Sequence, residues 1–174
     1  VAQHTFADEC TAEGAPPFIA FGARMVAPVI MTYGSAAQPQ YYELLADIGR
    51  FAEKPQARLL VAVAPPGELV GGIVYFGDMA HYGSGGSATS VKNASGIRLL
   101  GVSTRHRNLG AGRTLTQACI ELARKAGRAE VILHTTRAMQ VAWRLYESLG
   151  FVRSEDLDFS QQGLKVFGFR LQLK

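Results

Sequence analysis

The feature that most constrains this chain is a basic, glycine-bearing turn between an apolar strand and an amphipathic helix, within residues 99–113. The turn reads Arg107-Asn-Leu-Gly-Ala-Gly112, with the spacing Arg-x-x-Gly-x-Gly. The first turn of a helix has backbone N–H groups without intrahelical partners, and glycine has no Cβ. An anionic group can therefore approach the backbone closely at such a place. The turn predicts a site for a phosphate group.

Two other phosphate-binding loops are excluded by the spacing. A Walker A loop ends in Gly-Lys-Ser/Thr, whereas Gly112 is followed by Arg113 and Thr114, and a dinucleotide fingerprint needs a further glycine. Asn108 is one of the few non-glycine residue types that tolerate a positive φ, and the arginines can grip phosphate through paired hydrogen bonds. An ordinary strand-to-helix turn, in which glycine serves only tightness, is the alternative that the turn alone leaves open.

Apolar residues at steps of three and four predict an amphipathic helix directly after the turn. They are Ala111, Leu115, Ala118, Cys119, Leu122 and Ala126. Gly127 supplies a C-terminal stop, and residues 130–135 are typical of a buried strand. A strand–helix–strand unit is expected to have a right-handed crossover and a parallel strand pair.

The chain as a whole predicts one α/β domain over residues 1–174, with a mixed sheet. Strands are expected at residues 59–64, 69–76, 97–102, 130–135 and 165–173, and helices at 18–31, 41–52, 111–126 and 137–149. Residues 1–17 are polar and irregular, which favours a loose tail. Residues 77–95 are rich in Gly and Ser, and a loop of this length is either functional or disordered.

Two motifs resemble those of the GCN5-related N-acetyltransferases, the GNAT superfamily. The family's motif A, V-x-P-x-x-[R/Q]-x-x-G-x-[G/A], is matched from Val102 to Gly112, with Thr104 in place of the proline. Its motif B, L-Y-E-x-x-G-F, is matched from Leu145 to Phe151. The resemblance covers residues 58–172. It implies a mixed, mostly antiparallel sheet with helices on both faces and a splayed parallel strand pair that holds the cofactor.

The resemblance also implies that the cofactor is acetyl-CoA. The turn would bind its pyrophosphate, and the strand before the turn would pair with its pantetheine arm, with Gly101 suiting a bulge. Thr136 and Met139 stand where many members have asparagines; the threonine can donate a hydrogen bond, whereas the methionine can only pack. The expected cofactor-binding residues are Leu100, Gly101, Val102, Arg107, Asn108, Leu109, Gly110, Ala111, Gly112, Arg113, Thr136 and Met139.

Tyr146 occupies the family's tyrosine position and is expected to be the general acid that protonates the departing thiolate. A free thiol has a pKa of about 8.5, so this help is modest. A core tyrosine with a satisfied hydroxyl is the alternative. The base that takes the proton of the amine is open among Asp78, His81, Tyr82 and His134, with a packed histidine favoured for the last.

Three functions remain open, because the sequence does not identify the molecule that accepts the acetyl group. The first is an N-acetyltransferase that acts on a small-molecule amine, the second is the same reaction on a protein or peptide amine, and the third is a non-catalytic acyl-CoA-binding module. An acceptor site closed by residues 77–95 would favour the first, and an open acidic groove the second. A homodimer is a further expectation from the family.

The composition of the chain argues against several classes of binding partner. The net charge of +4 is spread along the chain without a Lys/Arg run, so no nucleic-acid partner is expected. Two cysteines and scattered histidines predict neither a disulfide framework nor a metal site. The apolar residues 18–33 are interrupted by Arg24 and Pro28 and are too short to span a bilayer. We therefore expect no membrane partner and, by default, a cytoplasmic protein.

Overall fold

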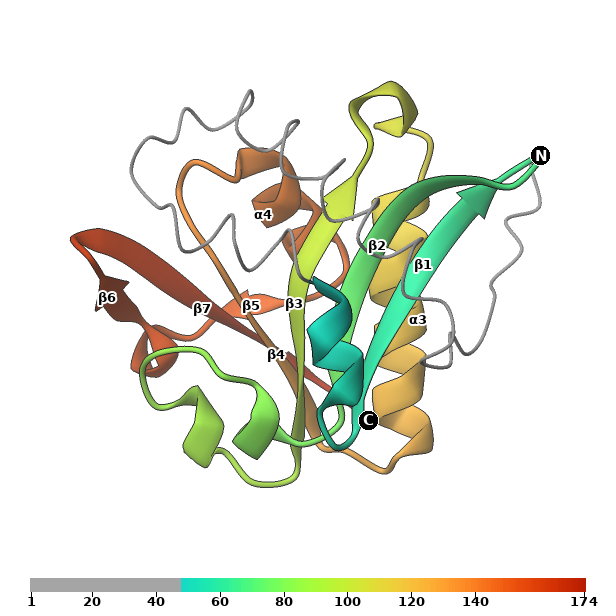
Figure 1. Cartoon of the computed structure of the whole chain (residues 1–174). Coiled ribbons are helices and arrows are strands. Elements are labelled where there is room, and N and C mark those ends of the chain that lie inside the picture. Colours follow the sequence, from blue (N-terminus) through green and yellow to red (C-terminus); the bar gives the residue numbers. More distant parts are fainter. Residues whose placement is uncertain (1–47) are drawn as a thin grey trace.

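The computed structural model describes residues 48–174, and its centre is a seven-stranded sheet in the order β1-β2-β3-β4-β7-β5, with β6 paired to β7 (Figure 1). The strands are β1 (Ala57–Ala64), β2 (Glu68–Phe76), β3 (Ala94–Val102), β4 (Glu130–Thr135), β5 (Val152–Arg153), β6 (Phe159–Gln161) and β7 (Leu164–Gln172). Among these strands only β3 and β4 pair in parallel. The sheet is therefore mixed and mostly antiparallel, as predicted.

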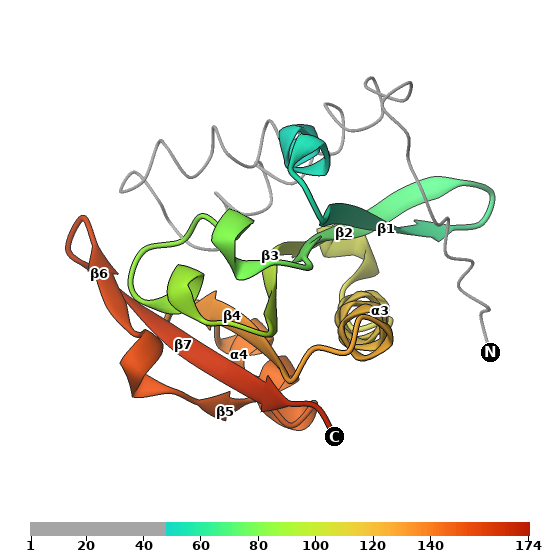
Figure 2. The ribbon, with the colours of Figure 1, turned by 90° about the horizontal axis from the view of Figure 1, so that it is seen from below.

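Two helices cover one face of the sheet. These are α3 (Ala111–Lys125) and α4 (Gln140–Ser148), and the 3-10 helix η2 (Ile48–Glu53) lies on the other face (Figure 2). The buried stripe of α3 contains Leu115 and Cys119, both 0% exposed, and belongs to the same apolar cluster as Ile73 and Ile97 of the sheet. On the opposite face, Phe51 of η2 belongs to a second apolar cluster. Helices on both faces confirm the predicted layers.

The Gly/Ser-rich segment between β2 and β3 is packed against the sheet on the face opposite α3. It contains two short 3-10 helices, η3 (Met79–His81) and η4 (Ala88–Ser90). Tyr82 is fully buried, and a Cβ atom on Gly96 would lie only 2.3 Å from its ring. A Cβ atom on Gly85 would likewise lie 2.7 Å from the ring of Phe159. The absence of a Cβ atom at Gly96 of the strand and at Gly85 of the loop therefore allows the loop to pack closely against the sheet.

Several element boundaries differ from the sequence-based expectations. β3 begins at Ala94, α4 begins at Gln140, and the described part of the helix expected at 41–52 is the 3-10 helix η2. The β6–β7 hairpin was not predicted, because Phe-Ser-Gln at 159–161 has little alternating apolar pattern. The helix expected at 18–31 and the tail at 1–17 lie outside the described residues.

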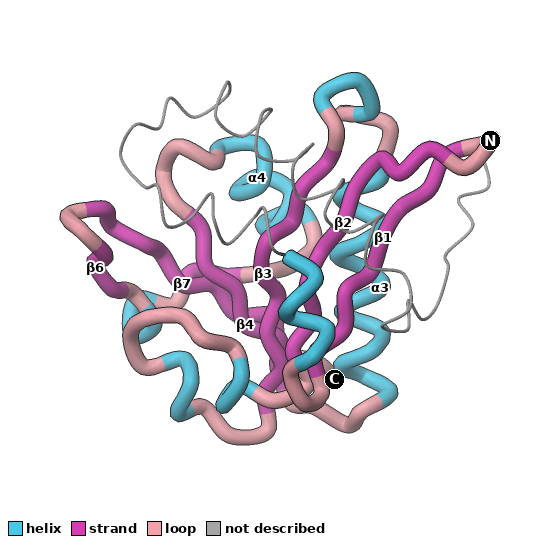
Figure 3. The backbone as a smooth tube through the Cα atoms, viewed as in Figure 1, coloured by secondary structure: helices cyan, strands magenta, loops and turns pink. Residues whose placement is uncertain are grey.

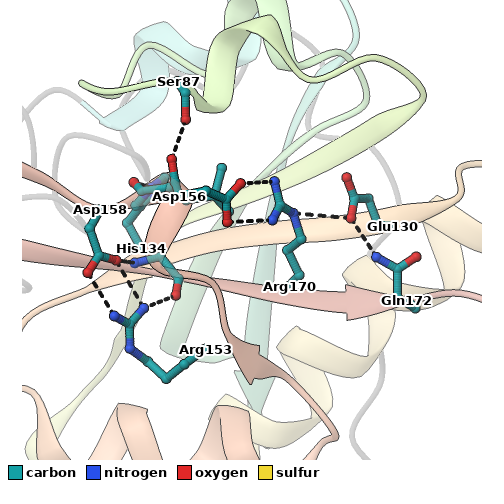
Figure 4. A network of polar contacts seen from close by, with 10 residues as sticks. Ser87, Glu130, His134, Arg153, Asp156, Asp158, Arg170 and Gln172 are labelled. Carbon is teal, nitrogen blue, oxygen red and sulfur yellow. Dashed lines mark hydrogen bonds and ion pairs between the residues drawn. The ribbon is translucent and has the colours of Figure 1, made fainter.

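A polar network holds the 3-10 helix η6 (Glu155–Leu157) against β7 (Figure 4). Arg153 donates hydrogen bonds to both carboxylate oxygens of Asp158, at 3.0 and 2.7 Å, and the amide of Gly168 donates to Oδ1 of Asp158 at 2.8 Å. A Cβ atom on Gly168 would lie 2.3 Å from Cβ of Leu157, so the two segments are in close contact. Asp158 is therefore the anchor of this segment.

We expect Asp158→Ala to lower the free energy of unfolding by about 1–3 kcal/mol at pH 7, because it removes the acceptor of the Gly168 amide and leaves the Arg153 guanidinium with only the Gly168 carbonyl as an acceptor among the described residues. Burial alone would raise the pKa of Asp158, but the hydrogen bond and charge of Arg153 hold that pKa below its ordinary value. The ionised Asp158 carboxylate therefore stabilises the folded protein at pH values above the pKa that it has in the unfolded chain. This stabilisation is lost as pH falls through the pKa that it has in the folded protein.

Urea denaturation at pH 7 and at pH 3 measures this effect. Asp156→Ala is the matched control, since the Asp156 side chain pairs with Arg170 but is 63% exposed, and exposed pairs contribute little. If both variants lost the same free energy of unfolding at pH 7, Asp158 would not be the anchor of this segment.

Candidate cofactor and acceptor site

The parallel pair separates at one end. β3 and β4 are paired from Ala94 with Glu130 to Ile97 with Leu133 and no farther, although both strands continue (Figure 3). This confirms the predicted splayed pair. The facing backbone edges of residues 98–102 and 134–135 have no strand partner within the described part of the chain. Backbone donors and acceptors away from water need partners, so these edges are suited to an extended ligand.

A β-bulge lies at the point of separation. Arg98 pairs with Val74 and Gly101 with Gly72, so Leu99 and Leu100 together face one residue of β2. Leu99 has a φ of +57°, which is rare for a branched side chain. The prediction of a bulge at Gly101 was wrong, because Gly101 is regularly paired. The Leu99 side chain is only 8% exposed, and its burial offsets the strained backbone.

The turn before α3 has the backbone conformations that its sequence predicts. Asn108 has a φ of +63°, and Gly110, the N-cap residue of α3, has a φ of +90°. Among residues 48–174, no side chain caps the helix, and nothing lies within 4 Å of a Cβ atom built on Gly110. The first-turn amides of Ala111, Gly112 and Arg113 therefore have no side-chain cap and lie at the positive end of the helix dipole, which suits an anion.

The other predicted cofactor residues gather at the same end of the sheet. Leu100, Gly101 and Val102 form the end of β3, and Thr136 and Met139 lie in the connection from β4 to α4, where the Met139 amide donates to the Thr136 carbonyl at 3.0 Å. They meet because the carboxyl ends of parallel strands share an edge.

The start of α3 also contacts α4. A Cβ atom on Gly112 would lie 3.6 Å from side-chain atoms of both Val102 and Leu145. Arg113 donates to Ser148 Oγ at 2.6 Å, so its guanidinium links the two helices. Leu109 is 61% exposed at the tip of the turn, and Arg107 is partly buried behind it.

Tyr146 lies on α4 and is 6% exposed. Its ring meets Phe151 edge to face, with 5.9 Å between centroids, and belongs to the apolar cluster that includes Leu133 of β4. The ring is therefore held firmly between α4 and the sheet.

Thr135 was missed by the sequence analysis. It is 3% exposed, and its Oγ1 atom is buried without a hydrogen-bond partner among the described residues. Such a hydroxyl costs about 1–3 kcal/mol unless something satisfies it. Thr135 lies beyond the last pair between β4 and β3, so a ligand between the strands would supply the partner. The orphan hydroxyl, the unpaired edges and the open, uncapped helix start together fit an acyl-CoA.

Three of the four candidate bases are engaged in holding the fold. Asp78 caps η3 through the Ala80 amide at 2.9 Å. His134 has Nε2 at 3.0 Å from the Leu157 carbonyl and Nδ1 at 2.9 Å from the Tyr82 hydroxyl. A carbonyl only accepts, so in the neutral ring Nε2 donates and Nδ1 accepts from Tyr82. The His81 ring, the fourth candidate, makes no hydrogen bond with the described residues.

We expect the His134 ring to titrate below its ordinary pKa of 6.5, because burial lowers that pKa. The unfolded chain then takes up a proton first as pH falls below 6.5, so stability falls between that pH and the folded pKa and levels off below it. NMR titration of the imidazole ring and urea denaturation from pH 7.5 to 5 measure the two effects. His134→Gln should remove this pH dependence and His81→Gln should keep it. A ring that titrates at or above 6.5 would contradict the interpretation.

Two features that would point to other partners are absent from residues 48–174. No helix there has the length and apolar character needed to cross a membrane. No group of three or more His, Cys, Asp or Glu side chains in the same range could hold a metal ion.

The comparisons with known proteins agree with this geometry. The family model described as "Acetyltransferase (GNAT) family" matches residues 27–151. The chain therefore belongs to the GNAT acetyltransferase family, which confirms the class of protein that the two motifs predicted.

Known structures share the fold. An acetyltransferase of the GNAT family from Staphylococcus aureus Mu50 has a TM-score of 0.72 at 16% identity, covering 99% of this chain and 100% of that one. The PaiA N-acetyltransferase from Thermoplasma acidophilum, in complex with coenzyme A, has a TM-score of 0.68 at 18% identity, covering 98% and 99%.

Two curated relatives are similar in sequence. N-acetylaspartate synthetase from Danio rerio is 28% identical over 85% of this chain and 49% of its own length. Mycothiol acetyltransferase from Thermobispora bispora is 42% identical over 33% of this chain and 19% of its own. The chain thus spans about half the length of the first relative and less of the second.

Proposed function

We propose that this chain transfers the acetyl group of acetyl-CoA to the primary amine of a small molecule, by direct attack of the amine. The observation that carries the proposal is the separation of β3 from β4 beside the uncapped start of α3. An extended arm can hydrogen-bond to the edge of β3 at Leu100, Gly101 and Val102, while the amides of residues 110–113 receive a pyrophosphate. A group held between two strands of one sheet can be approached from the face opposite α3 and α4.

Acetyl-CoA, when bound, supplies an acetyl thioester. A backbone N–H near the end of β3 would polarise the carbonyl oxygen of this thioester as the amine nitrogen attacks its carbon. Tyr146 would act as general acid and give its proton to the sulfur as the carbon–sulfur bond is broken. The amine proton passes to His81 or to water, since Asp78, Tyr82 and His134 are occupied in hydrogen bonds within the fold. The Thr135 hydroxyl, which has no hydrogen-bond partner among the described residues, is proposed to donate a hydrogen bond to the cofactor arm.

Two observations support a small acceptor. The loop between β2 and β3 is packed on the acceptor face, with Tyr82 fully buried. The Danio rerio relative is named for N-acetylaspartate, an N-acetylated amino acid, and its similarity extends over 85% of this chain. A protein or peptide acceptor is the alternative. The homodimer stays a prediction.

Calorimetric titration with acetyl-CoA, with ATP as control, tests cofactor binding, and thiol release with a panel of amines tests transfer. We expect acetyl-CoA to bind with a Kd in the micromolar range, about −8 kcal/mol, and ATP to bind far more weakly. Absence of acetyl-CoA binding would overturn the proposal. Binding without thiol release for any amine would favour a non-catalytic acyl-CoA-binding module.

A further inference from the structure

Arg98 lies where the parallel pair separates, on the face opposite α3. It follows Ile97, the last residue of β3 that pairs with β4. Its Nη1 atom donates to the carbonyls of Tyr82 and Gly83, each at 2.7 Å, and its guanidinium carbon is 5.5 Å from the centroid of the Tyr82 ring. These bonds use both protons of Nη1 and fix the plane of the group. Nε and Nη2, the edge that matches two coplanar oxygens, make no hydrogen bond with the described residues.

Lys54, which follows η2, approaches the same place. A Cβ atom built on Gly83 would lie 3.5 Å from Nη1 of Arg98 and 3.5 Å from Nζ of Lys54. The two nitrogens are therefore no farther apart than twice that distance. The Lys54 ammonium also lies 5.1 Å from the centroid of the Phe51 ring, so a cation–π contact helps to hold it there.

No carboxylate of the described residues makes an ion pair with either cation. Asp158 pairs with Arg153, and both Asp156 and Glu130 pair with Arg170. Burial raises the pKa of Tyr82 and lowers that of His134, and the nearby charge of Arg98 acts to lower both. Two like charges are thus held close together with no counter-ion among residues 48–174, an arrangement that an anionic ligand would stabilise.

We propose that the acceptor amine carries a carboxylate, and that Arg98 and Lys54 bind it on the face opposite the cofactor. This rests on the transferase function proposed above. The Nε and Nη2 edge of Arg98 receives both carboxylate oxygens, and Lys54 adds a second charge. Because Arg98 is two residues before Leu100 on the same strand, the carboxylate is held a short distance from the proposed thioester. The acceptor class is therefore an amino acid or a similarly short amino acid analogue.

The experiment measures thiol release from acetyl-CoA with the twenty common amino acids, each paired with its carboxamide. We expect at least one amino acid to be acetylated with a kcat/KM at least tenfold above that of its carboxamide. The matching aminophosphonate identifies the anion: a preference for it over the carboxylate overturns the carboxylate assignment. Carboxamides that react as well as the acids overturn the anionic acceptor altogether.

The variants Lys54→Gln and Arg98→Lys test whether these two side chains cause the preference for amino acids over their carboxamides. Each is expected to raise KM for the amino acid about tenfold, with kcat and the acetyl-CoA affinity unchanged. Arg98→Lys retains a donor for the two carbonyls but loses the forked edge, and Lys54→Gln leaves those carbonyl bonds intact. Lys165→Gln removes an exposed charge on β7 and should change nothing. Unchanged KM in both test variants overturns the assignment of the two residues.

The outcomes separate this inference from the proposed function. If acetyl-CoA does not bind, the proposed function fails first. If acetyl-CoA binds and uncharged amines are acetylated without any preference for a carboxylate, only the inference fails. If acetyl-CoA binds and no amine is acetylated, both fail.

Discussion

Gly110→Asp is expected to weaken acetyl-CoA binding by about 100-fold or more, since like charges placed side by side cost several kcal/mol. Gly110 has a φ of +90°, and no described residue lies within 4 Å of its Cβ position. A new carboxylate would therefore occupy the space that the amides of the α3 start offer to a phosphate. It would repel the pyrophosphate and compete for the same N–H groups. Calorimetric titration with acetyl-CoA measures the loss.

Two controls separate charge from backbone strain. Gly110→Ala imposes the same left-handed strain without a charge, and should weaken binding much less. Gly127→Asp adds a carboxylate at another open glycine, with a φ of +64°, at the opposite end of α3, and should leave binding unchanged. If Gly110→Ala weakens binding as much as Gly110→Asp, the anion site is not at this turn.

Tyr146→Phe is expected to lower kcat by about 10- to 100-fold, at the low end of general acid catalysis because a thiolate leaves readily. The acetyl-CoA affinity should not change. The ring stays in place, edge to face with Phe151, so the core keeps its packing. Steady-state thiol release at saturating acetyl-CoA, together with calorimetry of each protein, measures the two quantities.

Tyr75→Phe is the matched control for Tyr146→Phe. Tyr75 is 4% exposed, belongs to the same apolar cluster, and has a buried hydroxyl without a partner among the described residues. Removing that hydroxyl should leave kcat unchanged. An unchanged kcat in Tyr146→Phe would assign that tyrosine to packing alone.

The parts of the fold that were predicted from the sequence depend on local rules. The turn of residues 107–112 has its glycine and asparagine at the two positive-φ positions, 108 and 110, and the apolar stripe of α3 has the helical period. The hairpin of β1 and β2 has its apolar runs on either side of a Pro-Pro-Gly turn. The splayed pair was implied by the family resemblance and is confirmed by the register of β3 and β4.

The parts that were not predicted depend on contacts between distant segments. Leu99 adopts a positive φ because its side chain is buried by the tertiary packing, which no local preference indicates. The orphan hydroxyl of Thr135 becomes visible only once β4 is known to separate from β3. Arg98, Lys54 and Gly83 come from three segments, so their convergence has no spacing that a sequence could reveal.

The unpaired edges at 98–102 and 134–135 have a consequence for folding as well as for binding. A ligand that bonds to both edges replaces a missing strand, so it completes the sheet. Those amides of the two stretches that point into the gap should exchange with deuterium quickly in the free protein and slowly in the complex. Stability gained in this way grows with the ratio of ligand concentration to Kd, by about 2.7 kcal/mol at a hundredfold ratio. The abundance of such a protein in a cell would then follow the supply of its own acyl donor.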